Sequence, residues 1–192
     1  MMIAASVTEN EGRALGSAAE QLRRMLTEAS QRDWRIECDL SGSAANPELC
    51  IISLLPEAEG AEPIDSVRQR LHEHASAAAA AGASVFFCTI FRACENDAPK
   101  LERIRRLNLL APELSHDLDV GVIDFDRMLG DIGAQTLETD YRLGGAGARE
   151  VAAYTIVTTL LRGGLDDRVP DEVIERVRAI ADRIHRIRVG SQ

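Results

Sequence analysis

The sequence lacks the features that mark several common classes of protein. It has no cluster of basic residues, and its formal net charge is −9, so a nucleic acid partner is not expected. None of its four cysteines forms a CxxC pair, and no Cys/His group has the spacing of zinc ligands. We therefore expect reduced, structural cysteines, and the sequence predicts no metal site and no cofactor.

Long apolar runs are also missing. No stretch reaches the roughly 18 apolar residues of a membrane span. Residues 1–12 contain no basic segment followed by an apolar core, so no secretory signal is expected. We accordingly expect a cytoplasmic protein without a membrane partner. With 192 residues, 45% of them apolar, the chain is long enough to bury a sizeable core.

Apolar runs alternate with stretches of helical periodicity along the chain. Strands are predicted at 1–6, 34–40, 49–55, 84–91 and 120–125, and helices at 12–30, 64–81, 100–114 with a break near Pro112, 127–132 and 147–161. The run at 34–40 alternates apolar with charged residues, which is typical of an edge strand. Five repeats of strand and helix predict an α/β fold, a three-layer sandwich with a five-stranded parallel sheet of flavodoxin type. In such sheets functional residues gather at the carboxyl ends of the strands.

The composition changes after residue 162. We expect a domain at 1–162, a linker at 163–169 and a C-terminal amphipathic helix at 170–192. Apolar residues of this helix are spaced like a coiled-coil seam: Val173, Val177, Ile180, Ile184 and Ile187. The helix either packs back on its own domain or forms a homo-oligomer or partner-protein surface through residues 170–188.

Short blocks at the expected strand ends carry the candidate functional residues. Ala4-Ala5-Ser6 ends the first strand, Gly42 follows the second, and Glu57 follows the third. Asp140 precedes a Gly-rich turn and the last helix of the domain. This order and spacing resemble the SGNH, or GDSL-type, hydrolase superfamily over roughly residues 1–162.

The resemblance implies a role for each of these residues. Ser6 corresponds to the catalytic serine, and Asp140 corresponds to the acid of the triad. Gly42 matches the glycine whose N–H helps to form the oxyanion hole, and Glu57 lies nearest to the position of the oxyanion-hole asparagine. Leu143 occupies the place of the general-base histidine.

These departures from the family pattern remove two chemical functions. Leu143 cannot take a proton from a serine hydroxyl. An ionised Glu57 has no proton to donate to an oxyanion. None of the four histidines has a sequence partner that indicates a catalytic base. Ser6 also fits the turn and cap chemistry that precedes many helices.

We therefore expect a divergent SGNH-like protein, a pseudoenzyme that binds a small molecule, an acyl ester or a protein. The alternative is an active acyl-ester hydrolase or acyl/acetyl transferase that uses Ser6 with a non-standard base. A third hypothesis rests on carboxylates expected near one rim: Glu9, Glu57, Glu59 and Asp140. Gathered around a cleft, these groups could bind a cation or act as an acid/base pair, whereas dispersed they are a solvated acidic loop.

Overall fold

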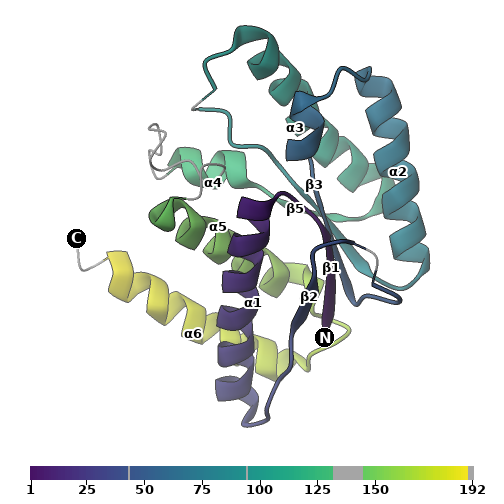
Figure 1. The fold of residues 1–192 in the computed structure, drawn as a ribbon. Helices are drawn as coiled ribbons and strands as arrows, with labels where there is room; N and C mark the ends of the chain where they lie inside the picture. The colour runs from purple at the N-terminus through teal and green to yellow at the C-terminus, as the bar shows by residue number, and fades with distance from the viewer. Residues whose placement is uncertain (43, 94, 132–144, 190–192) are drawn as a thin grey trace.

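A sheet of five parallel strands runs through the molecule (Figure 1). The strands lie in the order β2-β1-β3-β4-β5, with bounds Met2–Ser6 (β1), Glu37–Asp39 (β2), Leu49–Ser53 (β3), Ser84–Cys88 (β4) and Gly121–Ile123 (β5). The computed structural model describes residues 1–42, 44–93, 95–131 and 145–189, with the side chains of the last helix described up to residue 183. Every neighbouring pair of strands in these ranges is parallel, as the alternation of strands and helices predicts.

Helices cover both faces of this sheet and complete three layers (Figure 1). The α-helices in the described ranges are α1 (Glu9–Ser30), α2 (Ile64–Ala80), α3 (Ala98–Leu118), α4 (Phe125–Asp131), α5 (Ala146–Thr159) and α6 (Asp171–Val189), accompanied by a 3-10 helix, η1 (Leu55–Glu59), and a π-helix, η3 (Leu160–Gly164). One core lies between the sheet and α2, α3 and η1, and the other between the sheet and α1, α4, α5 and α6. The predicted three-layer α/β fold is therefore confirmed. None of the described helices is both long and apolar enough to cross a membrane.

The continuous apolar run of β3 explains its place in the middle of the sheet. All five of its residues are buried. Leu49 and Ile51 belong to the core on the α1 face, and Cys50 and Ile52 belong to the core on the α2 face. Because successive side chains of a strand point to opposite faces, a run with apolar side chains on both faces fits a sheet covered on both sides.

The strand predicted at 34–40 does lie at the edge of the sheet, but it is shorter than predicted. Only Glu37–Asp39 pairs with β1. Trp34 lies before the strand, and its Nε1 donates a 2.9 Å hydrogen bond to Ser30 Oγ at the end of α1. Trp34 is thus held at a helix terminus, and the Arg35 carbonyl accepts a 2.8 Å hydrogen bond from the amino group of Met1, just before β1.

Two helices are longer than their periodicity predicts. Helix α1 begins before residue 12, because Thr8 and Glu11 form a capping box that satisfies the free N–H groups of its first turn. Helix α3 continues through Pro112, where a break was predicted. Ala111 and Leu114 on either side of this proline are fully buried, and such packing stabilises a helix beyond its intrinsic propensity.

The C-terminal helix α6 packs on its own domain. Val173 and Val177 are buried in the core that contains α1 and α5. The segment predicted as a linker contributes Leu165 and Val169 to the same core. Of the two alternatives for this seam, packing within the chain is what the structure shows at Val173, Val177 and Ile180, its first three positions.

Two arginine side chains fasten the C-terminal segment. Arg168 donates to Ser84 Oγ (2.9 Å) and to the Gly82 carbonyl (2.8 Å) at the amino end of β4. Arg178 donates to the Leu161 carbonyl through Nε (2.9 Å) and Nη2 (2.5 Å). These bonds join α6 and the turn before it to the sheet and to the π-helix.

Candidate functional site

Ser6 and Gly42 lie next to each other at the carboxyl ends of β1 and β2. A Cβ added to Gly42 would be 3.8 Å from Ser6 Cβ and 3.7 Å from the Ala5 carbonyl oxygen. Gly42 has a φ of +68°, in the left-handed region that favours glycine. The structure thus brings together two of the residues that the SGNH resemblance singled out, and Ser6 is exposed to solvent there.

Ser6 has no imidazole partner among the described residues. It pairs in register with Ile52, whose side chain lies in the core on the α2 face. His72 and His74 belong to α2, and His116 lies in the last turn of α3; no hydrogen bond joins any of them to Ser6. Asp140 and Leu143, the predicted acid and the residue in place of the base, lie outside the described residues.

Glu57 takes part in an ion pair with Arg70 of α2. Its two carboxylate oxygens accept hydrogen bonds from Arg70 Nη1 (3.2 Å) and Nη2 (2.7 Å). Hydrogen bonds from Arg70 to Glu57 and then Glu62 raise the pKa of the guanidinium. Arg103 adds a 2.7 Å hydrogen bond to the Glu57 carbonyl oxygen. Glu57 therefore anchors η1 to the neighbouring helices, and its carboxylate offers no donor for an oxyanion.

The carboxylates predicted to share one rim are paired with different cations. Glu9 forms an ion pair with Arg13 in the same helix, and Glu59 forms one with Lys100 of α3. In the part of the chain that the structure describes, no group of three or more His, Cys, Asp or Glu side chains is arranged to hold a metal ion. Glu9 and Glu59 accordingly belong to the solvated surface, whereas the Glu57 side chain is only 17% exposed and is held by Arg70.

Glu11 is a buried carboxylate that the sequence analysis did not single out. It lies between β1 and β3, where the strand order of the sheet changes direction. Glu11 is only 3% exposed. Its Oε2 accepts hydrogen bonds from the Thr8 N–H and hydroxyl (both 2.8 Å), and its Oε1 accepts one from Ser53 Oγ (2.6 Å). The network spans the carboxyl ends of β1 and β3, the place at which ligands of flavodoxin-type sheets bind. The pattern Thr-x-x-Glu at residues 8–11 is a capping-box signature that could have predicted it.

A second polar group, which we call the β4–β5 cluster, consists of Thr89, Arg92, Asp124 and Asp126. Thr89 Oγ1 donates to Asp124 Oδ1 (2.9 Å) and accepts from the Asp126 N–H (3.1 Å). Asp126 Oδ2 lies 3.0 Å from Arg92 Nε, and Asp126 Oδ1 accepts a 3.1 Å hydrogen bond from the Arg92 N–H. Burial raises the pKa of Asp126 above its ordinary value of 3.8, against the opposing effect of Arg92. A carboxyl group perturbed by desolvation at strand ends is a candidate functional group.

A groove of about 650 Å³ opens beside the β4–β5 cluster. One wall is a stripe of α3 formed by Arg105, Asn108, Leu109 and Pro112. The other wall comes from the cluster itself and from Val122 of β5. This volume falls within the roughly 300–1,000 Å³ of small-molecule pockets. No sequence pattern distinguished these residues from an ordinary helix face and a polar loop.

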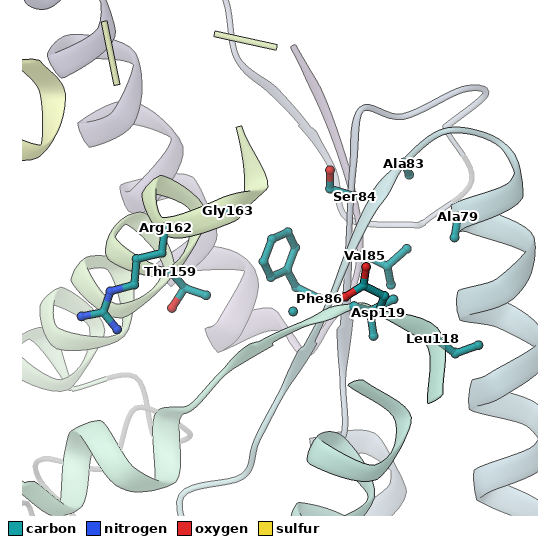
Figure 2. Close-up of a pocket in the computed structure, with 12 residues that line it drawn as sticks. Ala79, Ala83, Ser84, Val85, Phe86, Leu118, Asp119, Thr159, Arg162 and Gly163 are labelled. Atoms are coloured by element: carbon teal, nitrogen blue, oxygen red, sulfur yellow. The ribbon is translucent and has the colours of Figure 1, made fainter. Parts of the chain in front are cut away.

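Figure 2 shows another groove, of about 470 Å³, at the amino ends of β4 and β5. Phe86 lies in it, between Gly121 and Gly164: an added Cβ at these glycines would approach the ring to 2.2 Å and 2.7 Å. The Arg162 guanidinium points away from Phe86 and from Asp119 (Figure 2). Ligands of such sheets bind at the carboxyl ends of the strands, whereas this groove lies at the amino ends. We therefore interpret it as a result of how the Phe86 ring packs, and not as a ligand site.

The described cysteines are free thiols with little nucleophilic character. Burial raises the pKa of Cys38, Cys50 and Cys88, and the Glu11 carboxylate adds to the effect at Cys88. A raised pKa lowers the fraction of thiolate, which is the reactive form. The three residues fit the structural role expected for them, and Cys94 lies outside the described residues.

The structure thus places the predicted site residues in different surroundings. Ser6 and Gly42 lie together, Glu57 is engaged by Arg70, and Asp140 lies outside the described residues. The β4–β5 cluster and the bond from Ser53 to Glu11 emerge only from the fold. No protein-family model matches the chain, and no curated protein matches it either.

Proposed function

We propose that this chain is a divergent SGNH-like domain that binds a ligand and lacks ordinary esterase activity. The all-parallel sheet in the order β2-β1-β3-β4-β5 supports the relationship, because this is the flavodoxin-type order. The position of Gly42 next to Ser6 supports it too, since these residues match the nucleophile and the oxyanion-hole glycine of that superfamily.

The proposal rests mainly on the surroundings of Ser6, which would need a general base and an oxyanion-hole donor for catalysis. No described imidazole is bonded to Ser6, and Glu57 is held by Arg70 in a two-bond ion pair. A serine hydroxyl is a poor nucleophile until a positioned base removes its proton. Removal of one oxyanion-hole donor alone slows a serine protease by roughly 100-fold to 1,000-fold. The carboxyl edge also carries the polar groups of the β4–β5 cluster beside a groove. These groups support the binding of a ligand.

Turnover of p-nitrophenyl acetate and butyrate tests the proposal. The wild type and Ser6→Ala should give the same slow rate, because no described group activates the hydroxyl. Turnover by the wild type that Ser6→Ala abolishes would instead establish the alternative, a hydrolase or acyl transferase with a non-standard base. Gly42→Ala would then slow the same reaction, because an alanine at a φ of +68° is strained and would shift the backbone next to Ser6.

A further inference from the structure

The groove beside the β4–β5 cluster is polar at one end and apolar at the other. Arg105, Asn108, Leu109 and Pro112 follow one another at the i, i+3, i+4 and i+7 spacing of a single helix face. Helix α3 leaves the carboxyl end of β4 and runs back along the sheet, so Arg105 lies nearest the carboxyl edge. Leu109 and Pro112 lie further down, on the level of the strands.

Asn108 fixes this orientation. Its side-chain amide donates to the Ile90 carbonyl (2.8 Å) and accepts from the Ile90 N–H (2.7 Å), just beyond the end of β4. On the opposite wall Asp124 follows the end of β5, whereas Val122 lies within the strand and pairs with Phe87. Both walls therefore change from polar to apolar in the same direction.

The charges at the polar end leave one guanidinium weakly engaged. Arg92 is bonded to Asp126 at 3.0 Å. Arg105 lies 3.8 Å from Glu102, and both of these side chains are 54% exposed. An exposed pair at this distance contributes little free energy, so Arg105 can exchange Glu102 for a ligand at small cost.

The apolar end is open to solvent. Leu109 is 63% exposed, which is unusual for a large apolar side chain in the part of the chain that the structure describes, where Leu40 at 47% is the other example. Pro112 is one helical turn away on the same face. An apolar group laid over Leu109, Pro112 and Val122 would remove this surface from water.

We propose that this groove binds a small organic anion with an apolar body, its charged group on Arg105 and its apolar body along Leu109, Pro112 and Val122. The inference rests on the proposed function and names the ligand class for it. Guanidinium groups bind carboxylates and similar anions through paired hydrogen bonds. Arg92 offsets the charge of Asp126 at 3.0 Å. The other carboxylate of the groove, Asp124, accepts hydrogen bonds from Thr89 Oγ1 (2.9 Å) and the Arg127 N–H (3.1 Å). Desolvation of the Asp126 carboxyl indicates that the polar end is already partly withdrawn from water.

Calorimetric titration with octanoate tests the assignment. Octanoate should bind the wild type saturably at one site per chain, whereas acetate, which lacks the apolar body, and octanol, which lacks the charge, should bind at least about tenfold more weakly. Arg105→Gln and Leu109→Ser should each weaken octanoate binding by about tenfold or more. Arg24→Gln is the matched control, because Arg24 is an exposed arginine of α1 that pairs with Glu20 and does not line the groove.

Amide chemical shifts locate the bound octanoate. Changes should gather at residues 105–112 and 122–126 and leave Ser6 and Gly42 unaffected. Absence of saturable binding, or equal affinity in the wild type and Arg105→Gln, would overturn the assignment. Neither result bears on the esterase assay, whereas Ser6-dependent turnover of p-nitrophenyl esters would overturn the proposed function without deciding where octanoate binds.

Discussion

Ser53 Oγ donates a 2.6 Å hydrogen bond to Glu11 Oε1, and this bond joins the end of β3 to the first turn of α1. The other carboxylate oxygen of Glu11 accepts two hydrogen bonds from Thr8. With only 3% of Glu11 exposed, water cannot easily replace these donors. The network therefore fixes the two strands between which the sheet order changes direction, where a flavodoxin-type sheet opens its crevice.

Ser53→Ala should lower the free energy of unfolding by about 1–3 kcal/mol, because the buried Glu11 carboxylate loses a donor that solvent cannot supply. Urea unfolding followed by circular dichroism measures the change. Ser66→Ala on the exposed side of α2 is the matched control and should leave the midpoint unchanged. Equal midpoints for Ser53→Ala and Ser66→Ala would show that the bond contributes nothing to the fold.

Gly164→Ala should destabilise the protein by about 1–3 kcal/mol, because the added methyl group would overlap the Phe86 ring. Gly163→Ala is the control, since its Cβ would meet only Asp166 Oδ2 at 3.9 Å. Thermal unfolding of the two variants gives the comparison. Adding Phe86→Leu to Gly164→Ala should restore part of the loss, and a double variant less stable than both single variants would contradict the steric explanation.

Asp126 should make stability depend on pH in the acidic range. Burial holds the pKa of Asp126 above 3.8 in the folded protein, so the folded state binds this proton more tightly than the unfolded chain. The resulting stabilisation is fully present at pH values below the pKa of Asp126 in the unfolded chain. It is lost as the pH rises through the pKa of Asp126 in the folded protein. The free energies of unfolding of the wild type and Asp126→Asn are measured in urea at a series of pH values. The wild-type value minus the Asp126→Asn value should fall as the pH rises from the unfolded to the folded pKa of Asp126. A difference that increases with pH would have the wrong sign.

Val177→Asp should cost on the order of 3 kcal/mol or more, because it places a charge without a partner in the core shared by α1, α5 and α6. Arg176→Ala, on the exposed side of α6, should unfold at the wild-type urea concentration. Gel filtration completes the test. A Val177→Asp protein that kept its stability and changed only its mass in solution would show that α6 is an oligomer surface instead.

The layers of the fold followed from local patterns in the sequence. β3 has an unbroken apolar run at residues 49–52 and lies in the centre of the sheet, whereas the charged alternation of β2 placed it at an edge. Boundaries were less predictable where tertiary contacts extended or shortened an element. Trp34 looked like part of a strand, but its indole N–H is bonded to the end of α1. Pro112 looked like a helix break, but the buried residues around it keep α3 continuous.

The candidate site was only partly predictable, for a different reason. Ser6 and Gly42 could be paired because Ser6 ends β1 and Gly42 follows β2, and the carboxyl ends of these strands meet at one edge of the sheet. Glu57 follows such a strand too, yet Arg70 lies 13 residues further along the chain and determines where its carboxylate goes. The Thr89–Asp124 bond and the groove beside it depend on how α3 lies across the sheet, which no local pattern encodes.

Covalent labelling with a fluorophosphonate tests the central proposal most directly, because this reagent phosphonylates a serine hydroxyl only when a nearby base activates it. The intact mass of the wild type, measured after treatment, should be unchanged and should match that of treated Ser6→Ala. One adduct per chain in the wild type that is absent from Ser6→Ala would contradict the account and establish Ser6 as an activated nucleophile.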